Sequence, residues 1–188
     1  MSALTKNALI NSFMKILKEK NFDKITINDI TADCGVARMT FYYHFEDIYD
    51  MVSYIIQEKL RAFVNKDFTY ETWQQDYMAV YEAVLTEKVF FSKIFSSIDL
   101  RVIQSYLYTF ARQYVLGIID EQAKRLELTL NEKKREMVCS VYCYSMVGAL
   151  LSWISRGMNE EPSTYVVRFC RILTGTLEVS LKNSTENL

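Results

Sequence analysis

The stretch GVARMTFYYHF, Gly35 to Phe45, places two tyrosines and the only histidine of the chain side by side. A buried core does not require Tyr, Tyr and His in succession, whereas a surface that grips another molecule can use all three side chains as hydrogen-bond donors. The same stretch begins with a glycine, which favours the left-handed turn that ends a helix.

A short helix is expected on either side of Gly35. Thr26, with Asp29 three residues later, resembles a capping box with Asp in place of Glu, which predicts a helix that begins at Ile27 and ends at Gly35. Ala37 to Tyr43 can form a second short helix. Further helices are expected at 5–20, from about 46 to 65, and at 72–86, 89–96, 100–126, 132–156 and 163–182.

The composition favours an all-α protein with about nine helices. One proline and five glycines in 188 residues are too few for the turns of a sheet-rich fold. The expected organisation is a helix-turn-helix domain of three helices at 1–50 and a larger helical effector-binding and dimerisation domain at 51–188. Four sparse cysteines and the lack of a signal peptide or an apolar run of 18 residues favour a cytoplasmic protein that does not contact a membrane.

Residues 5–60 resemble the DNA-binding region of TetR-type transcriptional regulators. The similarity is carried by KITINDITADCGVARMTFYYHFEDIYDMV, and above all by Ile25-Thr26, Gly35-Val36, Thr40-Phe41-Tyr42 and His44-Phe45. The stretch GALLSWISRGMNEEPSTYV, near the C-terminus, is similar to one subgroup, the dihydroxyacetone-kinase regulators. The resemblance implies a dimeric regulator, more often a repressor, that binds an operator in double-stranded DNA.

The resemblance places the helix at 37–43 in the major groove of DNA. Arg38 can donate two hydrogen bonds to a guanine, and the Thr26 helix start can attract a phosphate. The residues implied to meet DNA are Thr26, Ala37, Arg38, Met39, Thr40, Tyr42, Tyr43 and His44. From the residues alone, Tyr42 and Tyr43 could instead be packing residues, and His44 could cap the end of the helix.

Two features depart from the family. Ile48 stands where many relatives have a phosphate-binding lysine, and residues 1–50 hold six basic and seven acidic side chains, a formal charge of −1. A basic footprint is typical of DNA-binding domains. These departures leave a second hypothesis open, a protein-interaction co-regulator that has lost independent DNA binding.

An effector site is expected among aromatic residues of the second half. Relatives often enclose a cavity there, and aromatic rings with hydroxyls suit a mostly apolar ligand, although such rings can equally form a plain core. The expected lining is Tyr81, Phe95, Tyr106, Phe110, Tyr142 and Met146, and the effector is a small molecule or a protein partner. Cys139 and Cys143 share a helix face, but without a third ligand nearby they are interpreted as packing residues, so neither a metal nor a cofactor is expected.

The last two long helices are expected to form a homodimer interface. Small residues on one stripe permit close approach of helices, and two helices from each subunit would form a four-helix bundle. The expected interface residues are Val141, Ser145, Gly148, Ala149, Ser152, Phe169 and Leu173. An enzyme is disfavoured, because the sequence has no phosphate-binding Gly-rich loop, no HExxH motif and no nucleophile elbow.

Overall fold

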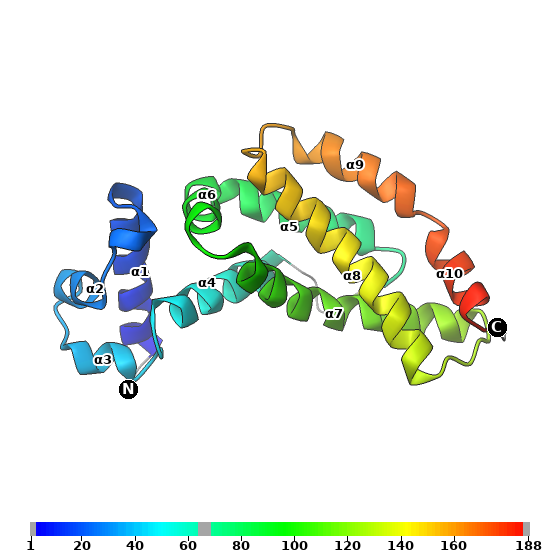
Figure 1. The fold of residues 1–188 in the computed structure, drawn as a ribbon, viewed down its shortest axis with the longest axis horizontal. Coiled ribbons are helices and arrows are strands. Elements are labelled where there is room, and N and C mark those ends of the chain that lie inside the picture. The colour runs from blue at the N-terminus through cyan, green and yellow to red at the C-terminus, as the bar shows by residue number, and fades with distance from the viewer. Residues whose placement is uncertain (1–2, 64–68, 186–188) are drawn as a thin grey trace.

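The computed structural model describes residues 3–63 and 69–185, and within them the chain forms ten α-helices and one short 3₁₀ helix, which confirms the all-α prediction. The molecule is elongated, with α1–α3 at one end and α10 at the other (Figure 1). The helices are α1 (Ala3–Glu19), η1 (Phe22–Lys24), α2 (Ile27–Asp33), α3 (Arg38–Tyr42), α4 (Ile48–Phe63), α5 (Trp73–Thr86), α6 (Lys88–Ser97), α7 (Leu100–Arg125), α8 (Glu132–Ser155), α9 (Pro162–Leu173) and α10 (Thr176–Thr185). The expected end of α4 near Asn65 lies outside the described residues.

The group α1–α3, which we call the head, follows the local signals of the sequence. The capping box at the start of α2 has both hydrogen bonds: the Asp29 backbone N–H donates to Thr26 Oγ1 at 3.1 Å, and the Thr26 N–H donates to the Asp29 carboxylate at 2.9 Å. Gly35 ends the following turn with a φ of +68°, a conformation that costs little without a Cβ. The connector before α2 contains η1, which the sequence analysis did not anticipate.

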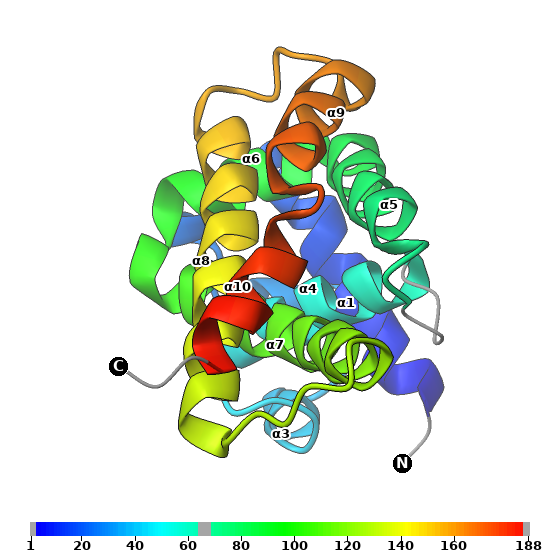
Figure 2. The ribbon, with the colours of Figure 1, turned by 90° about the vertical axis from the view of Figure 1, so that its right-hand side faces the viewer.

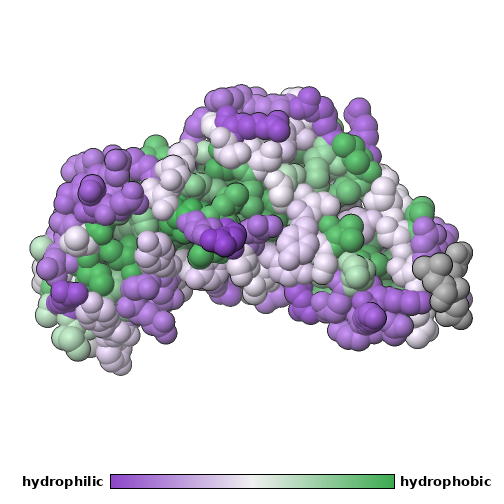
Figure 3. All heavy atoms as spheres, viewed as in Figure 1, coloured by the Kyte–Doolittle hydropathy of each residue, from purple (hydrophilic) through white to green (hydrophobic). Residues whose placement is uncertain are grey.

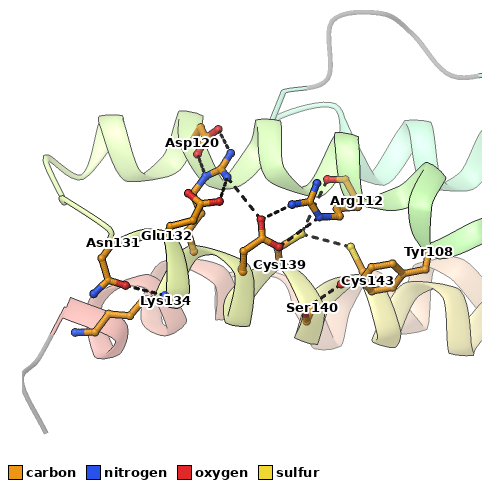
Figure 4. A network of polar contacts seen from close by, with 11 residues as sticks. Tyr108, Arg112, Asp120, Asn131, Glu132, Lys134, Cys139, Ser140 and Cys143 are labelled. Atoms are coloured by element: carbon orange, nitrogen blue, oxygen red, sulfur yellow. Dashed lines mark hydrogen bonds and ion pairs between the residues drawn. The ribbon is translucent and has the colours of Figure 1, made fainter. Parts of the chain in front are cut away.

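The remaining helices, which we call the body, are organised around the antiparallel pair α7 and α8. Figure 4 shows the polar contacts between them: Arg135 of α8 binds the Asp120 carboxylate at 2.7 Å, and Tyr108 and Ser140 share a hydroxyl hydrogen bond of 2.9 Å. Arg112 also pairs with Glu136. Asn131 caps α8, as expected, by accepting a hydrogen bond from the Lys134 N–H at 2.9 Å.

The segment expected as one helix at 163–182 is divided in two. Pro162 occupies the first turn of α9, as expected, but Gly175 adopts a φ of +79° and redirects the chain into α10. As a result α9 packs against α5, whereas α10 crosses the ends of α7 and α8 (Figure 2). Helical periodicity continued through 174–176, so only the left-handed glycine marks the break.

One hydrophobic core runs from the head into the body without interruption. It joins Phe13 and Phe41 of the head to Ile55 of α4 and then to Phe91 and Trp153 of the body, all nearly fully buried. The helix α8 is long and apolar enough to cross a membrane by length and composition, but half of that stretch is buried inside the protein. The buried half packs inside the protein, chiefly against α7.

Candidate DNA-binding and effector sites

The helix α3 presents most of the residues expected to meet DNA on the surface of the head. Phe41 points inward and is fully buried, which fixes the face of the helix that solvent reaches. On that face Met39 is 75% exposed and Tyr43 is 65% exposed, and Ala37 is exposed as well. Met39, Tyr43 and Ala37 thus lie side by side on an exposed surface of the head, which leaves them free to contact another molecule.

Arg38 and Tyr42 lie one turn apart on α3 and contact each other. Arg38 Nη2 donates a hydrogen bond of 2.9 Å to the Tyr42 hydroxyl, and the guanidinium lies 5.6 Å from the centre of the ring. The pair was not anticipated from the sequence, although a spacing of four residues places two side chains on one helix face. Tyr42 therefore limits the directions in which Arg38 can extend.

The start of α2 is already occupied by a carboxylate. Asp29 accepts hydrogen bonds from the backbone N–H and the hydroxyl of Thr26 and pairs with Lys20 at 2.9 Å. The Lys20 hydrogen bond, followed by those from Thr26, lowers the pKa of Asp29 to about 2. A phosphate at this helix start would thus meet a charged carboxylate, so the expected role of Thr26 in phosphate binding stays a prediction.

Several cations of the head are engaged within the protein. Lys15 pairs with Asp33 at 2.6 Å, Lys20 pairs with Asp29, and the Lys6 ammonium lies 3.3 Å from the ring centre of Tyr54. Half of the six basic side chains at 1–50 therefore have partners before DNA arrives. Since affinity that depends on salt comes from free cations, this arrangement weakens the electrostatic attraction of the head.

His44 and Thr40 are less accessible than their neighbours. Both are half-buried, and among the described residues His44 Nε2 is enclosed without a hydrogen-bond partner. The His44 ring packs against Tyr43 and Phe45, while its backbone N–H, rather than the ring, bonds to the carbonyl of Phe41 at the end of α3. A phosphate hydrogen bond from Nε2 would require the ring to rotate.

Two adjoining apolar clefts lie between α5, α7 and α8. Their volumes are about 80 and 40 Å³, below the usual 300–1,000 Å³ of ligand pockets. Trp73, Val115, Ile118 and Met146 border both clefts. Asp76 is the one charged side chain that borders either cleft among the described residues; it is buried, and one carboxylate oxygen accepts a 3.0 Å hydrogen bond from the Thr72 hydroxyl.

The structure brings together only part of the expected effector lining. Phe110 and Met146 border the larger cleft, and Tyr142 and Met146 border the smaller one. Tyr81 instead lies fully buried against Trp153 and Tyr165, where its hydroxyl bonds to that of Tyr77. Phe95 packs against the core on α6, and Tyr106 borders an open surface depression with Asp99 and Arg101, so neither reaches the clefts.

The helices α8, α9 and α10 carry exposed apolar residues on the face along which α8 runs (Figures 1 and 3). On α8 the expected residues Val141 and Gly148 are exposed, and Ser145, Ala149 and Ser152 are half-buried. A Cβ added at Gly148 would meet no atom within 4 Å, so the stripe is open in the isolated chain. The same stripe includes Met137, which is 64% exposed, and Tyr144, which is 54% exposed; the sequence analysis missed both.

Two residues expected at the interface face inward instead. The Phe169 ring lies 5.4 Å from that of Tyr77 on α5, and Leu173 borders the smaller cleft. On α9 and α10 the exposed apolar residues are Val167, Ile172 and Val179. The apolar stripe that the sequence shows on α9 therefore faces the inside of the chain, and not the expected dimer interface.

Cys139 and Cys143 are both buried, and their sulfur atoms are 3.7 Å apart. Figure 4 places them between α8 and the Arg112 segment of α7. No third His, Cys, Asp or Glu joins them into a group of metal ligands within the part of the chain that the structure describes. The hydrogen bond between the two thiols and burial raise the pKa of Cys143, while the same hydrogen bond lowers the pKa of Cys139.

Comparison with known proteins identifies relatives over nearly the whole chain. Residues 9–55 match the family described as "Bacterial regulatory proteins, tetR family", and residues 71–175, more than half of the chain, match the "Transcriptional regulator C-terminal region" of the type TetR_C_8. The chain is 20% identical over 160 residues to the HTH-type dhaKLM operon transcriptional activator DhaS of Lactococcus lactis. That similarity covers 85% of this chain and 84% of the relative.

Solved structures share the fold. The structure of the dihydroxyacetone kinase operon activator DhaS matches with a TM-score of 0.71 at 16% identity, and the match covers 95% of this chain and 98% of the other. The repressor FadR of Thermus thermophilus, solved in complex with lauroyl-CoA, matches with a TM-score of 0.58 at 14% identity over 89% and 92% of the two chains. At these identities the likeness establishes the fold alone.

Proposed function

Because this chain belongs to the TetR family of DNA-binding, non-enzymatic transcriptional regulators, we propose that it acts as a homodimer that binds an operator through α3 and is switched by an effector. In this proposal residues 1–50 form the DNA-binding domain, residues 51–188 form the regulatory and dimerisation domain, and the protein acts in the cytoplasm. The observation that carries the proposal is the exposed face of α3, held outward by the buried Phe41.

The proposed contacts with DNA fall into groups according to the chemistry of the side chains. Arg38 reads a base in the major groove, because its guanidinium can donate two hydrogen bonds to one guanine. Thr26, Thr40, Tyr42, Tyr43 and His44 position the head on phosphates, and Met39 and Ala37 contact apolar base edges. Because Lys6, Lys15 and Lys20 have partners within the protein, few counterions are released on binding.

The test is a binding titration of purified protein on its own upstream intergenic DNA and on a scrambled duplex, at several salt concentrations. Specific binding with a salt dependence shallower than the roughly tenth-power dependence of some dimeric repressors supports the proposal. The alternative is a co-regulator that acts through protein contacts. Equal, weak binding to both duplexes at every salt concentration would favour that alternative and count against operator binding.

We further propose that the two clefts form the effector site and admit a small, mostly apolar molecule. Their lining is mostly apolar and aromatic, and the carboxylate of Asp76, which borders the larger cleft, can accept one hydrogen bond from a ligand hydroxyl or amine. Short alcohols and amines should therefore raise the melting temperature of the wild type. Ile118→Trp, which fills the shared wall of the clefts, should abolish that rise. Val89→Trp, at an exposed site away from the clefts, should not.

The direction of regulation requires a separate measurement. One relative is named as an activator and another as a repressor, so the repressor expected from the resemblance does not follow from the comparisons. A reporter gene under the upstream promoter, with and without the regulator, decides the sign. Higher expression in the deletion strain supports a repressor, and lower expression supports an activator.

A further inference from the structure

Lys93 of α6 joins the body to the head through the end of α1. Its ammonium donates to three backbone carbonyls, those of Leu17 at 2.7 Å, Lys18 at 3.0 Å and Lys20 at 3.2 Å. An ammonium has three donors, so this contact uses all of them. The accepting carbonyls belong to the last turn of α1 and the residue after it, where a helix leaves its carbonyls without partners.

The chemical groups in this contact are suited to hold the end of α1 in a fixed position relative to α6. The C-terminal end of a helix carries partial negative charge, which attracts a cation. Within the described part of the chain, the partners of Lys93 are carbonyl oxygens and not carboxylates. Carbonyls of a helix cannot move independently of it, whereas a carboxylate on a flexible side chain can. The ammonium therefore holds the helix itself.

Both ends of this connection are anchored. On α6, Phe91 and Ile94, which lie close to Lys93 in sequence, are nearly fully buried in the hydrophobic core that runs from the head into the body. On the other side, the chain after Lys20 passes through η1 and directly into α2, the first helix of the turn-helix pair. The position of the α1 end relative to α6 thus determines where the DNA-binding helices start.

The contact lies at the end of α1 away from α3 (Figure 1). With 17 residues, α1 is about 25 Å long at 1.5 Å per residue. A tilt of about 10° at Lys93 would then move the far end of the head by roughly 4 Å, more than the 3.4 Å that separates successive base pairs. A small change of tilt at this contact would therefore displace the far end of the head by more than the spacing of two successive base pairs in an operator.

We propose that Lys93 is a positioning residue for DNA binding, which sets the tilt of the head on the body and hence the separation of the two α3 helices of the dimer. The proposal rests on the proposed function for its consequence on DNA, but the geometry of the head can be measured without DNA. Displacement of α6 in the body would reach the head through the same three hydrogen bonds.

The first test measures the distance between spin labels on the head and the body of one chain. Labels are placed at Asn7→Cys on α1 and Lys133→Cys on α8, both exposed sites, in a background with Cys34→Ser, because Cys34 is the half-exposed cysteine among four of which three are buried. Labelled chains are diluted with unlabelled protein so that only distances within a chain are seen.

Lys93→Met, which keeps the apolar stem and removes the donors, should broaden or shift the distance distribution by several ångströms. Lys93→Arg should restore the wild-type distribution. Lys88→Met, at an exposed lysine of the same helix, should leave it unchanged. If the methionine variant does not fold, Lys93→Leu, which also removes the donors, gives the same comparison. An unchanged distribution in folded Lys93→Met or Lys93→Leu would overturn the proposal.

The second test uses operators whose half-site spacing differs by one base pair in either direction. The wild type should prefer one spacing, and in Lys93→Met this preference should fall about tenfold, the effect of a hydrogen bond to a charged group at the weaker end of its range. A uniform loss of affinity at every spacing would indicate a merely structural role and refute the proposal. Wild-type protein that binds no operator would refute the proposed function, while the label distances would still decide the role of Lys93.

Discussion

Among single side chains, the pair formed by Arg38 and Tyr42 has the most direct consequence for DNA recognition. Because the Tyr42 hydroxyl holds Arg38 at 2.9 Å, the two residues should not contribute independently to binding. In a double-mutant cycle with Arg38→Ala and Tyr42→Phe, the coupling free energy on the operator should be roughly 0.5–1.5 kcal/mol, the range for one hydrogen bond. Additive losses would mean that Arg38 leaves Tyr42 when DNA binds.

Because of Asp29, the stability of the fold should depend on pH in the acid range. The pKa of Asp29 in the folded protein is about 2, below its ordinary 3.8, so its interactions stabilise the fold fully above pH 4 and are lost as the pH falls towards 2. Asp29→Asn should therefore lower the free energy of unfolding at pH 6, and the difference from wild type should shrink below pH 4. Urea unfolding across this range measures it, with Asp23→Asn as the control for the loss of one charge in the same segment.

A difference that stays constant down to pH 2 would contradict this explanation, because the charged form of Asp29 would then not matter. The Asp29 side chain is partly exposed, so added salt should reduce the effect.

At the scale of helices, two glycines of similar surroundings should respond in opposite directions to alanine. A Cβ at Gly175 or at Gly117 would meet no atom within 4 Å, but Gly175 has a φ of +79° whereas Gly117 lies within α7. Gly175→Ala should destabilise the fold by about 1–2 kcal/mol through backbone strain. Gly117→Ala should stabilise it by roughly 0.5–1 kcal/mol. Thermal or urea unfolding compares the two, and equal effects would show that the break between α9 and α10 is not strained.

The helices show how far the sequence could predict this fold. Capping signals are local, so Thr26, Asn131 and Pro162 located three helix starts correctly. The division at Gly175 was missed because the apolar period continues across it, and only a backbone angle distinguishes a break from a continuous helix. Phe169 and Leu173 were expected at the dimer interface, but they lie on the inward face of α9. An apolar stripe on a helix can pack against the same chain or against another chain, and the sequence does not distinguish the two.

The candidate sites were predictable to different degrees. The exposed face of α3 followed from a local motif, since one buried residue, Phe41, orients the whole helix. The clefts depend on how α5, α7 and α8 pack together, which is a property of side chains far apart in sequence. Hence two residues of the expected lining, Phe110 and Met146, border the larger cleft, whereas Tyr81 fills the core. The Lys93 contact has no signal in the sequence at all, because its partners are backbone carbonyls.

For the whole molecule, the proposed dimer makes a prediction with a closely matched control. Val141 on α8 and Val89 on α6 are 56% and 55% exposed, but only Val141 lies on the proposed interface. Val141→Glu and Gly148→Glu would each bury two carboxylates in a symmetric dimer, so the dissociation constant should rise at least about a hundredfold. Val89→Glu should leave it unchanged. Sedimentation at micromolar concentration distinguishes the outcomes, and dimers in all three variants would place the interface elsewhere.

The uninterrupted core has a consequence for how the protein opens. Since Phe13 and Phe41 share one apolar cluster with Ile55, Phe91 and Trp153, the head cannot expose its interior without uncovering the residues behind it. Amide hydrogens of α1 should therefore exchange with solvent as slowly as those of α8, through global unfolding, instead of through a separate opening of the first fifty residues. A fragment that ends at residue 50 would lack Ile55 and its neighbours on α4, and should remain a largely disordered peptide in solution.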